Sequence, residues 1–288
     1  MKSKTKRKVR KRQSLARNAQ GKDRKLKPAP VVENVKKSFR LAGKVAIITG
    51  ADSGIGKAVA LMYAKEGADL VLTYYRDRKD ARETSQRVKE LGARHILLQG
   101  DVSDEDHCKR IVRAAINTYK KLDIVINNAA VQYPQDKLAK ITKRQIQRTF
   151  EVNVFSHLYL VKAAEKYLKK GSSIIHTTSV TAYRGSSHLI DYAATKGAIH
   201  AFTKSLAQNL VDQGIRVNCV APGPVWTPLN PSDKPAEDVA KFGADTPMKR
   251  PAQPEEIAPA FVYFASELDS SYVTGEVLTL LGGETTAG

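Results

Sequence analysis

From Leu41 onward, short apolar runs of seven to nine residues alternate with stretches that have helical spacing. The runs are apolar on almost every residue, which is typical of strands covered by helices on both faces of a parallel sheet. The order predicts one doubly wound α/β domain over residues 41–288, with ligands bound beyond the carboxyl ends of the strands. The expected strands are 44–50, 69–75, 95–102, 123–130, 172–179, 215–223 and 275–283, and the expected helices are 55–68, 79–92, 104–122, 141–171, 192–213 and 253–266.

Residues 1–40 have a different composition. Positions 1–27 hold thirteen Lys or Arg and one acid, which is +12 of the formal net charge of +19. With so few apolar residues, this segment cannot bury enough surface to order itself. We therefore expect a basic disordered tail and linker. Such a tail is either solvated, a targeting segment, or a polyanion-binding arm that gains affinity by releasing counterions.

The rest of the composition excludes several classes of protein. No run approaches the roughly 18 apolar residues that a membrane span needs, and no apolar region typical of a secretory signal follows the start. Cys108 and Cys219 have no metal-ligand spacing, so we expect packing thiols in a reducing, cytoplasmic setting. No His, Asp or Glu cluster has such spacing either, and we predict no catalytic metal.

The segment TGADSGIG, residues 49–56, joins the first expected strand to the first expected helix. Glycines at 50, 54 and 56 permit a tight turn and a close approach of the backbone to a pyrophosphate at the helix N-terminus. The spacing is G-x-x-x-G-x-G, whereas the commoner dinucleotide fingerprint is G-x-G-x-x-G. A plain structural turn is the alternative interpretation.

This loop resembles that of the short-chain dehydrogenase/reductase family, and further motifs of the family follow in order over residues 41–283. They are GDV at 100–102, NNAA at 127–130 with Ala130 in place of the usual glycine, Asn153, Ser179, Tyr192 with Lys196, and PGPVWT at 222–227. The segments 178–199 and 222–229 also resemble those of a subgroup of bacterial oxidoreductases with N-terminal extensions. The resemblance implies a Rossmann-like fold, a homotetramer formed through the two long helices and the C-terminal strand and helix, and cofactor contacts from Gly50, Asp52, Ser53, Gly54, Ile55, Gly56, Tyr75, Arg76, Asp101, Val102, Asn128, Ala129, Ala130, Tyr192, Lys196, Pro222, Gly223, Val225 and Thr227.

Tyr192 and Lys196 are four residues apart, and residues with this spacing share one face of a helix. A nearby ammonium favours phenolate, so we expect Lys196 to lower the pKa of Tyr192 from its ordinary value near 10. The resemblance implies that Tyr192 is the general acid/base, that Lys196 holds the nicotinamide ribose and that Ser179 hydrogen-bonds the substrate oxygen. It also implies that Asn153 supports a proton-relaying water. The plainer alternatives are a chance Tyr–Lys pair, a turn-capping serine and a buried structural asparagine.

The second expected strand ends in LTYYRDRK, without the acid that binds the ribose hydroxyls in NAD-using folds. Arg76 follows at once and could meet a 2′-phosphate. Ser53 and Asp77 argue the other way, because neither is basic. We predict NADP(H) as the preferred cofactor, with NAD(H) still possible.

Residues 224–252 are expected to form a lid over the substrate, as in the family. Trp226, Tyr183 and Leu189 could line an apolar pocket beside Ser179 and Tyr192, or could simply be packing residues. We predict interconversion of an alcohol with a small aldehyde or ketone. The competing hypothesis is a polyanion-binding or nucleotide-sensing protein that acts through its basic tail.

Overall fold

The computed structural model describes residues 14–15, 26–27, 39–229 and 242–285. The chain divides into two units, residues 1–37 and 38–288. In the first unit, β1 (Ser14–Leu15) and β2 (Leu26–Lys27) pair as short antiparallel strands. The expected disordered tail otherwise lies outside the described residues and stays a prediction.

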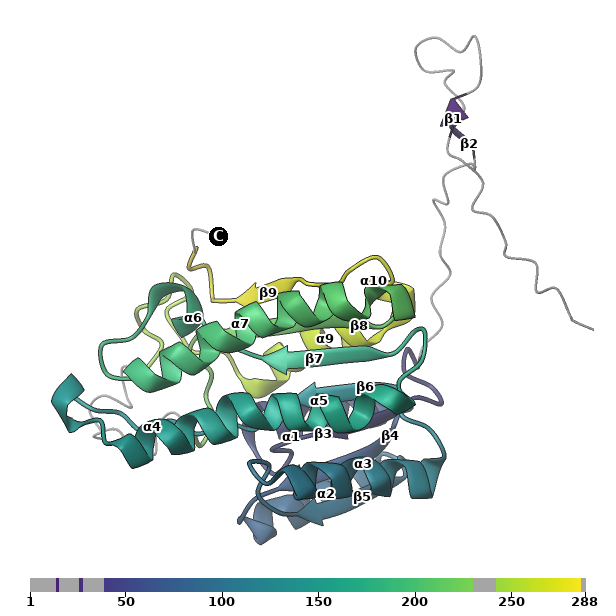
Figure 1. Ribbon diagram of the computed structural model, residues 1–288, viewed down its shortest axis with the longest axis horizontal. Helices are drawn as coiled ribbons and strands as arrows, with labels where there is room; N and C mark the ends of the chain where they lie inside the picture. The colour runs from purple at the N-terminus through teal and green to yellow at the C-terminus, as the bar shows by residue number, and fades with distance from the viewer. Residues whose placement is uncertain (1–13, 16–25, 28–38, 230–241, 286–288) are drawn as a thin grey trace, which may run out of the picture. The chain divides into compact units, whose positions relative to one another are not determined.

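Seven parallel strands form the single sheet of the second unit (Figure 1), in the order β5-β4-β3-β6-β7-β8-β9. Each expected strand is present, usually one to three residues shorter at its ends. This confirms the predicted Rossmann-like α/β fold with a doubly wound parallel sheet. The strands are β3 (Val45–Ile48), β4 (Asp69–Tyr74), β5 (His95–Gln99), β6 (Ile124–Asn127), β7 (Ser173–Thr177), β8 (Arg216–Pro222) and β9 (Val277–Leu280).

The sheet grows outward from β3 in both directions. β3 pairs with β4 on one side and with β6 on the other, so the strand order reverses between β3 and β6. The loops that follow these two strands turn to opposite faces. They leave a crevice at the carboxyl edge of the sheet, where folds of this kind bind ligands.

Side chains of each central strand alternate between two apolar layers. Ala46 and Ile48 of β3 pack in a cluster with residues of α1 and α9, whereas Val45 and Ile47 pack in a cluster with residues of α3, α5 and α7. Burial on both faces explains why the strands are apolar on almost every residue. The main helices are α1 (Gly54–Lys65), α2 (Arg78–Glu90), α3 (Glu105–Tyr119), α7 (Ile190–Leu210) and α9 (Pro254–Ala265).

The expected continuous helix at 141–171 is divided. It consists of α4 (Lys143–Phe150), a π-helical turn η3 (Glu151–Phe155), α5 (Ser156–Ala164) and the 3-10 turn η4 (Glu165–Tyr167). Asn153 lies within the π-helical turn. A π-helical turn adds a residue to the helix and often marks a functional site.

A capping box is half formed at the start of α4. Thr142 Oγ1 accepts a hydrogen bond from Gln145 N at 3.1 Å. The Gln145 side chain does not return to Thr142 but donates to Asp191 Oδ2 at 3.1 Å. The glutamine therefore joins α4 to the first turn of α7, which carries Tyr192.

Three short elements were not expected from the sequence: η2 (Leu138–Lys140), α6 (Thr181–Arg184) and α10 (Glu267–Ser270). Each is a single turn, too short for a periodic pattern. The end of the helix expected over 192–213 is the 3-10 turn η5 (Val211–Gln213). In the part of the chain that the structure describes, we find no helix with the length and apolar character of a membrane span.

Candidate active site

A cavity of about 660 Å³ opens at the carboxyl edge of the sheet, at the crevice predicted from the strand order. It is lined by the loops that follow β3 to β8 and by the first turns of α7. With the exception of Gly56, every residue expected to contact a cofactor lines this cavity.

The glycine loop is shaped by close backbone contacts. Gly50 and Gly54 have positive φ values of 63° and 52°, which favour glycine. A Cβ added at Gly56 would lie 1.9 Å from Gly50 O, so Gly56 acts by letting α1 pack against its own loop. The first turn of α1 contains no acid, and Ser53 makes no side-chain capping bond there. This arrangement fits a pyrophosphate, which binds free N–H groups at a helix N-terminus.

The NNAA segment braces that loop from the neighbouring strand. Asn128 Nδ2 donates to Thr49 O at 3.1 Å and to Gly50 O at 3.3 Å. Thr49 Oγ1 accepts from Asn128 N and Ala129 N at 2.9 and 3.1 Å. The two sides of the topological switch point are therefore joined by hydrogen bonds directly beneath the cavity.

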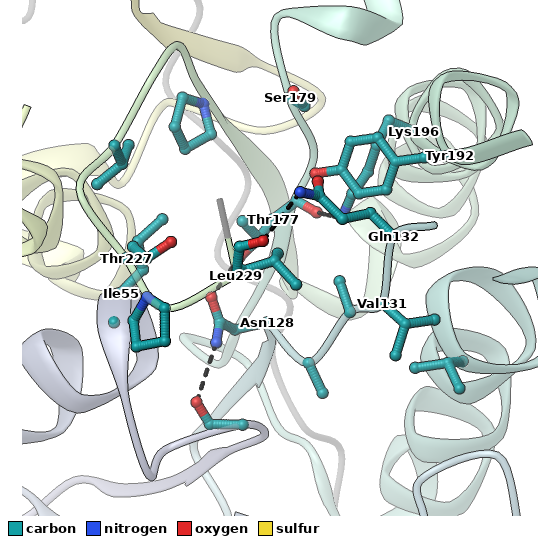
Figure 2. A pocket seen from close by; sticks show the side chains of 18 of the residues that line it. Ile55, Asn128, Val131, Gln132, Thr177, Ser179, Tyr192, Lys196, Thr227 and Leu229 are labelled. Atoms are coloured by element: carbon teal, nitrogen blue, oxygen red, sulfur yellow. Dashed lines mark hydrogen bonds between the residues drawn. The ribbon is translucent and has the colours of Figure 1, made fainter. Parts of the chain in front are cut away.

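Tyr192, Lys196 and Ser179 lie at the far end of the cavity from the β4 loop, on α7 and after β7 (Figure 2). The Lys196 Nζ atom lies 5.3 Å from the centroid of the Tyr192 ring and donates to Thr177 O at 2.8 Å. Ser179 Oγ accepts from Thr181 N at 3.2 Å, which fixes the serine side chain. The one-turn spacing thus brings the phenol and the ammonium together, as expected.

Burial dominates the protonation of this pair. It raises the pKa of Tyr192 to about 12, against a smaller opposing effect of hydrogen bonding with Ser179. It also lowers the pKa of Lys196 to about 8. The expected lowering of the tyrosine pKa is therefore wrong for this structure, because burial removes the phenol from water and disfavours its charged form.

Asn153 is fully buried and lies behind the cavity. Its Oδ1 accepts from Val131 N at 2.8 Å, and its Nδ2 donates to Val131 O at 2.9 Å and to Thr195 Oγ1 at 3.1 Å. The side chain braces the loop after β6 against α7. The expected support of a water by Asn153 stays a prediction, since its amide is occupied by these three bonds.

His176 is buried in the core beneath the catalytic end. Its Nδ1 lies 3.1 Å from His157 Nδ1 and 3.3 Å from Asn127 Nδ2. Burial lowers the pKa of His176 to about 3 and lowers that of His157 as well, so both rings are neutral. Among the described residues, no group of three His, Cys, Asp or Glu is placed to hold a metal ion.

The expected substrate residues divide into two groups. Leu189, Ser179 and Tyr192 line the cavity, whereas Tyr183 and Trp226 are not part of its lining. The Tyr183 ring packs on His200 with centroids 5.1 Å apart, and the Trp226 ring packs 6.2 Å from that of Phe242. Residues 230–241 of the expected lid lie outside the described residues.

Sequence reasoning missed several lining residues. Gln132 donates from Nε2 to Leu229 O at 3.0 Å, which ties the loop after β6 to the segment after β8 (Figure 2). Arg148 lines the end of the cavity opposite Tyr192. Gln132 lies two residues after the NNAA segment and could have been found from that position, whereas no local pattern distinguishes Arg148. Arg184 was not missed: its position five residues after Ser179 indicated the pocket mouth, and it lines the cavity and forms an ion pair with Glu284.

The loop after β4 closes the cavity at that opposite end. Arg76 Nη2 donates to Tyr75 Oη at 2.8 Å, and its guanidinium carbon lies 4.5 Å from the Tyr75 ring centroid. Asp77, which counted against NADP(H) in the sequence, is the N-cap of α2 and accepts a hydrogen bond from Asp80 N at 3.1 Å. Asp77 does not line the cavity, so Arg76 is the charged residue of this loop that faces it.

Comparison with known proteins places the chain in a family. A family model described as enoyl-(acyl carrier protein) reductase matches residues 50–285. A solved structure of a short-chain dehydrogenase from Burkholderia cenocepacia in complex with NADP is 31% identical, with a TM-score of 0.79 over 85% of this chain and 98% of the other. The protein belongs to the short-chain dehydrogenase/reductase family of oxidoreductases.

Its curated relatives cover nearly the same length. An uncharacterized oxidoreductase of Bacillus subtilis, YhxC, is 54% identical over 89% of this chain and 90% of its own. A protein of Arabidopsis thaliana named NADPH-dependent aldehyde reductase 1, chloroplastic, is 48% identical over 85% and 88%. The glucose and ribitol dehydrogenase of Daucus carota is 44% identical over 91% and 93%.

Proposed function

We propose that the protein interconverts a carbonyl compound and an alcohol by hydride transfer with NADP(H). The proposal rests on one observation: Tyr192, Lys196 and Ser179 line the same cavity as the glycine loop. A scaffold that only sensed a nucleotide would not need a buried phenol and a buried ammonium beside a serine hydroxyl. A bound nicotinamide would supply or accept the hydride.

In carbonyl reduction, Tyr192 donates its proton to the oxygen that becomes the alcohol. The pKa of about 12 keeps the phenol protonated, which suits an acid. Ser179 donates a hydrogen bond to the same oxygen and stabilises its growing negative charge. The Lys196 ammonium, fixed by Thr177 O, holds ribose hydroxyls and adds positive charge beside the phenol.

Alcohol oxidation requires the reverse proton movement, from the substrate hydroxyl to a tyrosinate. Burial opposes that charge on Tyr192. Positive charge from an oxidised nicotinamide would lower the cost. Near neutral pH, Tyr192 is therefore in the protonated form that carbonyl reduction requires.

Two features support NADP(H) over NAD(H). Arg76 faces the cavity directly after β4, where a 2′-phosphate would lie, and no carboxylate of that loop does so. The relative from Arabidopsis thaliana is named for NADPH, and the structure from Burkholderia cenocepacia contains NADP.

The names of the relatives point to aldehydes and to sugars or polyols as substrates. The cavity agrees with a small polar substrate, because Ser179, Gln132 and Arg184 are polar residues on its wall. We also propose a homotetramer. Exposed apolar side chains on η3 and α5, Phe155 and Leu158, could pack against a second copy. The polyanion-binding alternative rests on the tail alone and is not favoured.

The test is an absorbance assay of NADPH oxidation with a panel of aldehydes and ketoses. Tyr192→Phe should abolish turnover while the variant still binds NADPH, because only the acidic hydroxyl is removed. Tyr272→Phe, at a fully exposed tyrosine, is the matched control and should match wild type. Full turnover by Tyr192→Phe would refute the proposal.

A further inference from the structure

Arg148 lies on α4 at the end of the cavity far from Tyr192, and no step of the proposed reaction uses it. Its Nη2 atom lies 2.7 Å from Asp101 Oδ2, and its Nη1 donates to Ser103 Oγ at 2.8 Å. The side chains of both ion-pair partners are 27% exposed. A guanidinium that contacts two side chains in this way fixes their orientation as well as neutralising the carboxylate charge.

The Asp101 carboxylate is held from both sides. Its Oδ1 accepts from Ser103 N at 3.0 Å and from Ser103 Oγ at 2.7 Å, while Oδ2 faces Arg148. Burial by itself would raise the pKa of Asp101, but the Ser103 bonds and the Arg148 ion pair outweigh it and lower that pKa. The carboxylate is therefore ionised and oriented before any ligand arrives.

The same guanidinium also reaches the loop after β4. Its central carbon lies 5.6 Å from the Tyr75 ring centroid, and Arg76 contacts the same ring at 4.5 Å. Arg148 thus connects residues that follow two neighbouring strands, Tyr75 after β4 and Asp101 after β5. All four side chains line the cavity.

We propose that Arg148 is a positioning residue for the adenosine half of the dinucleotide. Resting on the proposed function, the inference is that Arg148 holds the Asp101 carboxylate and the Tyr75 ring as one preformed surface. An adenine offers a flat π face, which stacks on aromatic rings and guanidinium planes, and an amino group that donates to a carboxylate. Preforming this surface lowers the entropic cost of binding.

The competing explanation is a purely structural ion pair that joins α4 to the loop after β5. The two explanations differ in which half of the cofactor responds. A structural role would disturb any cofactor that uses the site. A positioning role would affect only ligands that contain adenosine.

The test compares Arg148→Met, which keeps an apolar stem, with Arg144→Met on the exposed face of the same helix. Isothermal titration should show the Kd for NADPH and for adenosine 2′,5′-bisphosphate rising about tenfold in Arg148→Met, as for loss of a charge-assisted contact. Arg144→Met should leave both unchanged. With reduced nicotinamide mononucleotide, which lacks the adenosine half, kcat/KM of Arg148→Met should equal that of wild type.

Two further variants test whether Arg148 acts through Asp101. Arg148→Lys keeps the positive charge but loses the planar guanidinium, and should bind NADPH more tightly than Arg148→Met and less tightly than wild type. In an Asp101→Asn background, Arg148→Met should weaken NADPH binding by less than twofold, because the residue acts through a partner already removed.

An equal loss with the mononucleotide, or unchanged affinity for NADPH, would overturn the inference while the proposed function stands. Wild-type protein that binds neither NADPH nor the bisphosphate would overturn both.

Discussion

The two ends of the cavity use charge in opposite ways. At the β4 and β5 end, Arg76 and Arg148 are partly solvated, and Arg148 is paired with Asp101. At the α7 end, Lys196 is fully buried, forms no ion pair with a carboxylate of the described residues, and has a pKa lowered to about 8. The solvated Arg76 suits recognition of an anion and the paired Arg148 suits the holding of Asp101, whereas a buried cation whose pKa is close to neutrality suits proton transfer. The β4 and β5 end of the cavity is therefore suited to binding, and the α7 end to proton transfer.

The largest expected effect is at the buried end. Lys196→Met should lower kcat by about a thousandfold, within the range for loss of a group that supports acid catalysis. Lys204→Met changes the same residue type on the exposed face of α7 and should have no effect. Steady-state kinetics at saturating cofactor would check this. Equal rates for the two variants would remove the distinction between the two ends.

The pH dependence sharpens the comparison. Above pH 8, Lys196 loses its proton, so kcat/KM for NADPH in the reduction direction should fall about tenfold per pH unit. Tyr192, with a pKa of about 12, should add no limb between pH 6 and 10. The alkaline limb should vanish in Lys196→Met. A profile that stays flat to pH 10 in the wild type would show that the burial of Lys196 does not set its charge.

His157 and His176, the buried pair behind the catalytic end, predict that the folded state loses stability in acid. His157 and His176 have lowered pKa values in the folded state, so the unfolded state binds more protons as the pH falls below about 6.5. The free energy of unfolding therefore keeps its full value above about pH 6.5 and declines as the pH falls toward 3. The loss should be at most about 2 kcal/mol per histidine between pH 7 and pH 5.

Urea unfolding at several pH values would measure this loss. His157→Gln should reduce the slope of the free energy of unfolding against pH below about pH 6.5. If the free energy of unfolding of His157→Gln varies with pH as in the wild type, groups other than this histidine cause the loss of stability in acid.

The smallest effect is at the exposed end. Arg76→Met should raise KM for NADP(H) about tenfold and leave KM for NAD(H) unchanged, because only NADP(H) carries the 2′-phosphate. Arg82→Met, an exposed arginine of α2, is the matched control. Initial rates with each cofactor would test this. A parallel rise for both cofactors would mean that Arg76 supports the loop and does not select the phosphate.

Much of this molecule could be predicted from local sequence. The seven strands follow from runs such as VAII and from the glycines after them, and the positions of Tyr192 and Lys196 follow from helical spacing. The π-helical turn at Asn153 could not be predicted, because it depends on bonds to Val131 and Thr195, distant in sequence. Tyr183 and Trp226 were expected at the substrate, but neither lines the cavity; their rings pack against His200 and Phe242.

The sequence by itself determined the order of strands and helices, the glycine loop and the spacing of the phenol and the ammonium, since all depend on neighbours along the chain. The tertiary structure decided the protonation of that pair and the role of Arg148. Both depend on which groups burial brings together: desolvation acts through everything that surrounds a side chain. The Arg148 ion pair joins residues 47 positions apart (148 minus 101) that meet only when β5 and α4 converge on one cavity.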